Sequence, residues 1–262
     1  MANVEDWDAP FPMTNSTTFN LESVLRQNIL ISLYYKNTCT ELNTWEEVVD
    51  EIYENVHNVE PWMSGNARGP STAFCLMYRL FTLKITSREV KNLLDHKDSP
   101  YIRAVGYLYL RYVCDPKELW KWCSPHAAFR EELTPSPDGK VVTIGDFVRD
   151  LMLEQYYFET IFPRIPKPTM DQIADDLKSR GLPYTGKGNA GAGGVDRRGV
   201  DDGNKRPASV KASLSVAMGQ RAPNRAGARE ERSNVLVNKS AANGGDRGRA
   251  GGRRPSPGLE EE

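Results

Sequence analysis

The sequence predicts an all-α fold: one compact domain of several helices over residues 19–180, followed by a disordered tail over residues 181–262. The runs Ser71–Lys84 and Tyr101–Cys114 are apolar on nearly every side, which is typical of helices buried inside a domain. Each run has about 14 residues, whereas a membrane-spanning helix needs about 20. We therefore expect these runs to be the central helices of a soluble domain.

The composition of the chain changes near residue 180. Residues 1–180 carry 19 basic and 26 acidic side chains, a net charge of −7, whereas residues 181–262 carry 15 and 9, a net charge of +6. All eight phenylalanines precede residue 181, and 16 of the 21 glycines follow residue 180. Such a tail buries too little apolar surface to offset its chain entropy, so it is expected to be disordered. Residues 1–18 show no apolar periodicity and are expected to form a flexible arm.

Helical spacing of apolar residues predicts the first two helices. The first covers about Asn20 to Tyr35. Thr44 starts the second, and Glu47 three residues later completes a capping box. The apolar stripe from residue 45 to residue 56 makes this helix amphipathic.

Proline and capping residues bound the central helices. Pro70 is expected to start the helix through residue 84, and Thr86 caps a short helix that ends near Asp95. Ser99-Pro100 and Asp115-Pro116 each place a capping residue before a proline, which starts a helix at little cost.

The C-terminal third of the domain is less regular. Thr134–Ile144 contains two prolines and an Asp-Gly pair, so it is compatible with a small β-hairpin near residues 138–144 or with a surface loop. Thr143 is expected to cap a helix through about Phe158. The prolines of residues 162–168 impose an extended segment, and a last helix covers residues 169–180.

The residues that carry chemistry form no enzymatic pattern. The motifs of hydrolases, nucleotide-binding loops and metalloproteases are missing from the sequence. The spacing of Cys114, Cys123 and His126 matches no zinc pattern, so we interpret them as two core thiols and a surface imidazole. We expect no catalytic site, metal, cofactor, small-molecule substrate or membrane contact.

Three arginines lie on helices that are otherwise apolar: Arg79, Arg103 and Arg111. A buried charge requires a partner. The interpretation we favour is an internal ion pair with Asp95, Asp98 or Asp115, and the alternative is an anchor for an acidic peptide or an RNA phosphate.

Loops between the helices provide the candidate contacts with other proteins. Trp62 lies in a loop rich in proline and glycine, where it either closes the core or anchors a partner. The candidate protein-interaction residues are Trp62, Glu60, Asp98, Arg103, Arg111 and Arg164.

Arginines in the glycine-rich tail suggest a second function. Flexible arginine attracts RNA phosphate without reading sequence, so weak RNA contacts are the alternative hypothesis. The candidate residues are Arg197, Arg198, Arg247, Arg249, Arg253 and Arg254.

Several longer segments occur together and in a characteristic order: VVDEIY, HNVEPW (His57–Trp62), STAFCLMYRLFTLK, DSPYIRAVGYLYLRY, TIGDFVRDLM and FPRIP (Phe162–Pro166). Through them, residues 20–168 closely resemble the pre-mRNA-splicing factor 38 family, and its B-type members most. The tail lacks the long arginine–serine repeats of B-type animal members.

This resemblance implies a mostly helical, non-enzymatic component of the spliceosome in the nucleus. It implies action around the U4/U6·U5 tri-snRNP and the precatalytic complex, in activation rather than in the chemistry. The domain is expected to be a protein-interaction scaffold whose partners are spliceosomal proteins and snRNP components.

Overall fold

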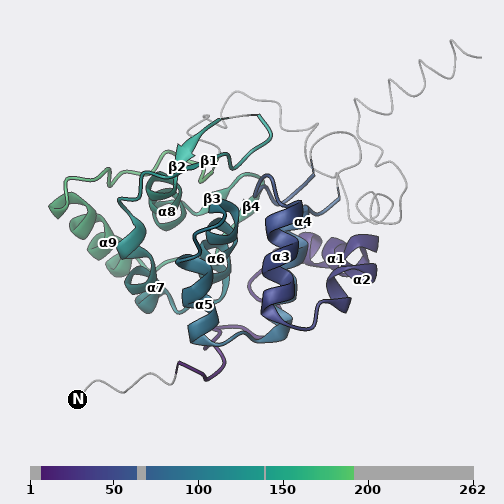
Figure 1. Cartoon of the computed structure of the whole chain (residues 1–262). Coiled ribbons are helices and arrows are strands. Elements are labelled where there is room, and N and C mark those ends of the chain that lie inside the picture. Colours follow the sequence, from purple (N-terminus) through teal and green to yellow (C-terminus); the bar gives the residue numbers. More distant parts are fainter. Residues whose placement is uncertain (1–6, 64–68, 139, 192–262) are drawn as a thin grey trace, which may run out of the picture. The chain divides into compact units, whose positions relative to one another are not determined.

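The computed structural model describes residues 7–63, 69–138 and 140–191, and within them it confirms the all-α class (Figure 1). The α-helices are α1 (Ser23–Ile31), α2 (Leu33–Asn37), α3 (Trp45–Asn55), α4 (Thr72–Leu83), α5 (Ser87–Leu94), α6 (Pro100–Val113), α7 (Pro116–Cys123), α8 (Ile144–Leu153) and α9 (Lys167–Ser179). Two 3₁₀ turns, η1 (Cys39–Glu41) and η2 (Ser124–His126), and four short strands complete the fold. Among the described helices, none is long and apolar enough to cross a membrane.

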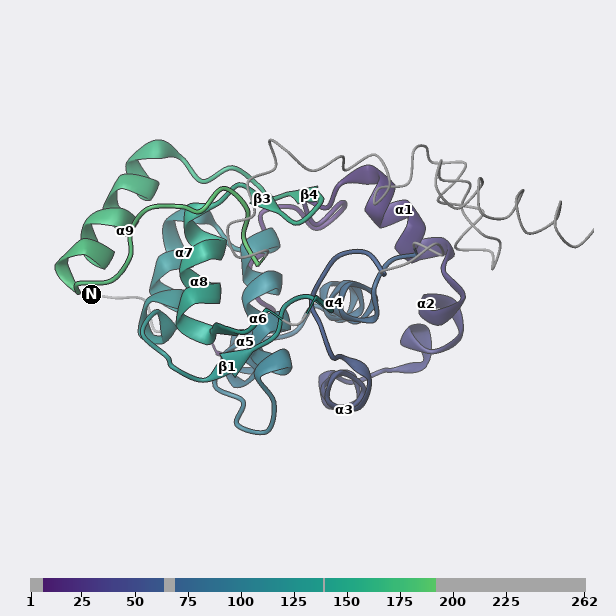
Figure 2. The ribbon, with the colours of Figure 1, turned by 90° about the horizontal axis from the view of Figure 1, so that it is seen from above.

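Helix α6 lies at the centre of the domain and packs against α3, α4, α5, α7 and α8. Figure 2 shows α1–α4 on one side of it and α7–α9 on the other. Every residue of α6 from Ile102 to Val113 is buried, as its apolar sequence predicts. Its residues Tyr107, Tyr109 and Tyr112 are among the largest fully buried side chains, together with Phe74 and Phe81 of α4. The two apolar runs therefore form the middle of the core.

Capping geometry confirms the predicted starts of α3, α5, α6, α7 and α8. Complete capping boxes join Thr44 to Glu47 at α3 and Thr86 to Glu89 at α5. The hydroxyl of Ser99 accepts a hydrogen bond from the amide of Tyr101 at the start of α6. Helix α4, in contrast, begins at Thr72 rather than at Pro70, because the hydroxyl of Ser71 accepts from the amide of Phe74 and caps the helix there.

Two helices differ from the prediction in length. The expected helix over residues 20–35 is divided at Ser32, whose hydroxyl accepts from the amide of Tyr35 and so starts α2 as a new helix. Helix α8 ends at Leu153 rather than at Phe158. Phe158 has a positive φ of 48° and turns the chain between β3 (Tyr156–Tyr157) and β4 (Thr160–Ile161).

A small antiparallel strand pair occurs near the predicted hairpin. Strand β1 (Glu132–Leu133) pairs with β2 (Val142–Thr143), and because β2 starts nine positions after Leu133, the two strands are not joined by a tight two-residue turn.

Residues on both sides of the segment 19–180 also contact its helices and strands. In the segment expected to be a flexible arm, the amide of Phe11 donates to Ile85 O at 2.8 Å, and the Phe11 ring is buried against α6 and α7. After α9, Gly188 N donates to Glu154 Oε1 at 2.5 Å and Ala190 N to Tyr156 O at 2.9 Å, so residues 187–191 pack on α8 and β3. The rest of the predicted disordered tail, residues 192–262, lies outside the described residues.

Candidate protein-interaction surface

Arg111 lies in the last turn of α6 and is held by main-chain oxygens. Its Nε donates to Leu151 O at 2.8 Å, Nη1 to Pro163 O at 2.7 Å, and Nη2 to Glu154 O at 3.4 Å. The Leu151 carbonyl is one of the unpaired oxygens at the C-terminal end of α8, where the helix dipole favours a positive charge. These partners replace the carboxylate that we expected, because the end of α8 and the segment after β4 meet at this point.

Burial lowers the pKa of Arg111 to about 10, and its guanidinium lies 4.6 Å from the centre of the Phe162 ring. Only 3% of the residue is exposed. We therefore place Arg111 as a support that fastens residues 162–166 to α8, rather than as a direct contact with a partner. Arg79 is also held by a main-chain oxygen, because its Nε donates to Leu42 O at 2.8 Å.

Arg103 is buried on α6 and forms an ion pair with Glu131, a carboxylate that was not among the expected partners. Asp95 instead accepts from His126, with 3.0 Å between Oδ1 and Nε2. The His126 ring also packs against Tyr107 and is only 5% exposed, which corrects the expectation of a surface imidazole. The imidazole is buried because η2 packs against α8 and the ring itself contacts Tyr107 of α6.

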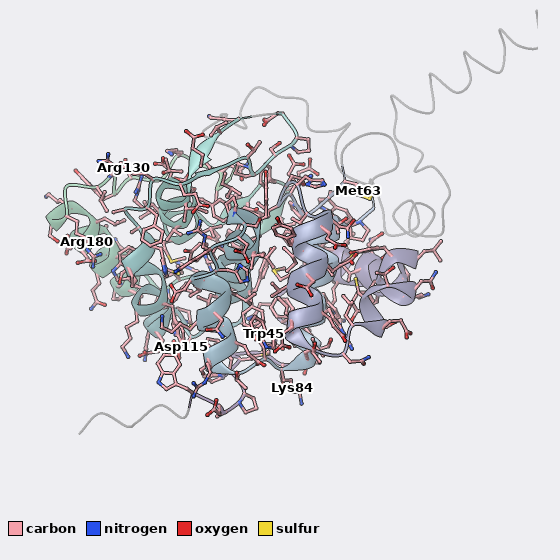
Figure 3. The ribbon with its side chains drawn as sticks, viewed as in Figure 1. Trp45, Met63, Lys84, Asp115, Arg130 and Arg180 are labelled. Atoms are coloured by element: carbon pink, nitrogen blue, oxygen red, sulfur yellow. The ribbon has the colours of Figure 1, made fainter. Side chains whose placement is uncertain are left out.

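Trp62 lies in the segment that joins α3 to α4, and its side chain belongs to the core. It is 3% exposed and its backbone pairs with Pro70 across the loop. The next residue, Met63, is labelled in Figure 3 and is 49% exposed. Of the two interpretations left open by the sequence, the structure places Trp62 inside, and the neighbouring Glu60 accepts a hydrogen bond from the hydroxyl of Ser136.

Two of the predicted contact residues are exposed. Asp98 lies in the turn between α5 and α6, and Arg164 lies in the extended segment before α9. Together with half-buried Glu60 they remain candidates for direct contact with a partner. Trp62, Arg103 and Arg111 are buried, so they support the surface residues rather than contact a partner directly.

A cleft that was not predicted from the sequence is lined by residues of α5, α7 and η2 and by Trp7. We call it the Trp7–Trp122 cleft; its lining residues are Trp7, Lys91, Leu94, Asp95, Lys121, Trp122, Pro125 and His126. The two tryptophan rings meet edge to face, with 5.8 Å between their centres. Trp7 was the sequence signal for this cleft, because such a large aromatic ring normally packs against other side chains, even in a segment without apolar periodicity.

The size of this cleft indicates the kind of ligand that it fits. Its volume is about 260 Å³, below the usual 300–1,000 Å³ of small-molecule pockets. Aromatic walls with a charged rim are typical of sites that receive one anchoring side chain of a protein partner. The rim charges come from Lys91, Asp95 and Lys121.

Charge on the domain favours proteins over nucleic acids as partners. The outward side of α3 exposes Glu46, Asp50 and Glu54, and the net charge of residues 1–180 is −7. A negative surface repels the phosphate backbone. The tail arginines proposed to contact RNA all lie outside the described residues.

The cysteines are free and buried, as the sequence predicts. Burial raises the pKa of Cys114 to about 12 and that of Cys123 further, so both thiols stay protonated and are poor nucleophiles. Within residues 7–191, apart from the undescribed gaps, no group of three or more His, Cys, Asp or Glu side chains is arranged to hold a metal ion.

Comparison with known proteins identifies residues 12–175 as a match to the model of the PRP38 family. The chain is 54% identical over 209 residues to pre-mRNA splicing factor SR-like 1 of Arabidopsis thaliana, covering 80% of this chain and 52% of that protein. It is 42% identical over 202 residues to human pre-mRNA-splicing factor 38B, covering 70% of this chain and 37% of that protein. The chain thus matches about half or less of the length of these relatives.

The fold is also found among solved structures. The crystal structure of the Snu23–Prp38–MFAP1(217–258) complex of Chaetomium thermophilum matches with a TM-score of 0.54 and 21% identity. The match covers 65% of this chain and 87% of that chain.

Proposed function

Because the chain belongs to the PRP38 family, we propose that it is a non-enzymatic scaffold for other proteins in pre-mRNA splicing. The observation that carries this proposal is the match over residues 12–175, together with relatives that are named as pre-mRNA splicing factors. We propose further that it acts in the nucleus, around the U4/U6·U5 tri-snRNP and the precatalytic complex, during activation.

The physical mechanism of such a scaffold is differential binding. A protein shifts an assembly toward one state only by binding that state more tightly than the next. A rigid helical domain suits this task because its surface loses little conformational entropy when a partner docks. The Trp7–Trp122 cleft, the turn of Asp98 and the segment of Arg164 offer contacts that the packed core holds in place.

The proposed partners are spliceosomal proteins and snRNP components. The Chaetomium structure supports this class, since it contains a protein of the same fold in complex with Snu23 and MFAP1. RNA binding through the tail is the competing function, and it predicts that affinity for RNA falls steeply with salt and disappears without residues 192–262.

Affinity purification from nuclear extract tests the proposal. The tagged full chain is compared with a chain that ends at Gly191, because an earlier end removes residues packed on α8. Lys121→Glu reverses a charge on the cleft rim, and Lys117→Glu, on the exposed side of the same helix, is the matched control.

We expect the full chain and the shortened chain to recover splicing proteins, and Lys121→Glu to recover less than Lys117→Glu. Depletion of the protein from the extract should block splicing of a reporter transcript before the first step. Intron removal that continues after depletion would overturn the proposed role. Loss of all partners on removal of residues 192–262 would favour the tail as the functional part.

A further inference from the structure

Two loops far apart in the sequence close on each other beside α3. The amide of Val59 donates to Pro135 O at 2.9 Å, and the hydroxyl of Ser136 donates to the carboxylate of Glu60. The Val59 carbonyl in turn accepts from the hydroxyl of Tyr157 at 2.5 Å. We call this contact between residues 57–62 and 134–138 the loop seam. It holds the segment that leads into buried Trp62.

Ser136 precedes Pro137, the dipeptide that proline-directed protein kinases recognise. These kinases bind their substrates as extended chain, so the local conformation decides which Ser-Pro pair is accessible. Ser99 and Ser124 also precede proline, but Ser99 caps α6 and Ser124 directly follows α7. In contrast, the described residues of the segment 134–141 belong to no helix and to no strand.

We propose that Ser136 is a phosphorylation site, and that phosphate on its oxygen opens the loop seam. In the reaction, Ser136 Oγ attacks the γ-phosphorus of ATP, the new Oγ–P bond forms as the bond to the β-phosphate oxygen breaks, and ADP leaves. The hydroxyl proton passes to the catalytic base of the kinase. This inference is independent of the proposed role in splicing.

Charge makes the closed seam and the phosphate incompatible. In the closed state the Ser136 hydroxyl donates a proton to a carboxylate, which is a strong hydrogen bond. A phosphate adds a charge of about −1.5 to −2 and removes that donor, so the same position now brings two anions together. Glu60 repels the phosphate instead of binding the hydroxyl.

Burial makes the coupling reciprocal. Ser136 is 5% exposed in the closed seam, although Pro137, Asp138 and Lys140 beside it are exposed. A kinase therefore reaches the hydroxyl only when the loop opens. If phosphate favours the open loop, then any change that opens the loop must also favour phosphorylation.

The test is a phosphorylation time course on the folded full chain, with a proline-directed kinase and ATP, read by site-resolved mass spectrometry. A synthetic peptide of residues 130–142 gives the rate for the unfolded sequence. Glu60→Gln weakens the seam, and Glu54→Gln, on the exposed end of α3, is the matched control for loss of one negative charge.

We expect Ser136 to be modified more slowly in the folded chain than in the peptide, and about three- to tenfold faster in Glu60→Gln than in Glu54→Gln. In the phosphorylated protein, amide exchange at Val59 should rise about five- to tenfold, because its hydrogen bond to Pro135 is lost. Failure of the peptide or the folded chain to be modified overturns the proposal. So does a modified protein with unchanged exchange at Val59, since the seam then stays closed.

Discussion

Replacing Arg111 should destabilise the domain more than any other single arginine of the candidate set. The guanidinium donates to three carbonyl oxygens, of which Leu151 O and Pro163 O are at 2.8 and 2.7 Å. In Arg111→Ala these two oxygens lose their donor in a site that is nearly closed to water. An unsatisfied buried polar group costs about 1–3 kcal/mol, so the pair predicts a loss of roughly 2–6 kcal/mol.

Arg111→Lys separates charge from geometry. Lysine keeps the positive charge but lacks the planar fork that reaches two oxygens at once, so we expect a smaller loss, about half that of the alanine variant. Arg164→Ala is the control, because Arg164 is exposed on the extended segment that contains Pro163. This substitution should change stability by less than about 0.5 kcal/mol.

Urea denaturation measures these differences as shifts of the midpoint at unchanged slope. The order expected is Arg164→Ala nearest to the unmodified protein, then Arg111→Lys, then Arg111→Ala. A loss below about 1 kcal/mol in Arg111→Ala would refute the reasoning, since it would mean that the carbonyl oxygens gain little from the guanidinium. If Arg111→Ala does not fold, the lysine variant still distinguishes the outcomes.

Three further predictions concern the same domain. Gly145→Ala should cost about 1–3 kcal/mol because its new methyl would lie 2.8 Å from two backbone oxygens; Gly106→Ala, which first meets side-chain atoms at 3.1 and 3.2 Å, should cost less in the same denaturation assay. A chain ending at Gly181 should be about 1.5–4 kcal/mol less stable than one ending at Gly191, because it loses two hydrogen bonds donated by backbone amides, one to a side-chain carboxylate and one to a backbone oxygen, and an ion pair; equal midpoints would contradict this. Burial acts to raise the pKa of Asp95, but Lys91 and His126 outweigh it and lower that pKa, so its stabilisation is present above about pH 4 and is lost as the pH falls through the lowered value. Midpoints measured across the acidic range should therefore fall less steeply in Asp95→Asn than in the unmodified protein.

Local signals explain why the helices were predictable. The capping box of Thr44 and Glu47 and the Ser99-Pro100 pair act within three residues, so the sequence contains all that is needed to start α3 and α6. The apolar character of α6 similarly predicts its burial. The division at Ser32 was missed because serine is tolerated in helices and starts a new one only when the chain bends there.

Partners distant in sequence explain what was not predictable. The oxygen of Leu151 is 40 residues from Arg111, and no residue type marks a free carbonyl in advance. Trp7 was predicted to lie in a flexible arm, because its contact residue Trp122 is far away in the sequence.

The sequence by itself determined the helical class, the helix starts and the resemblance to the family, because each depends on neighbouring residues or on the order of segments. The tertiary structure decided which polar and aromatic residues face solvent: it buried Trp62 and His126 and left Asp98 and Arg164 exposed. The physical reason is that burial depends on which elements pack together. Packing brings together residues that are distant in the sequence, and the residues next to each of them do not indicate its partner.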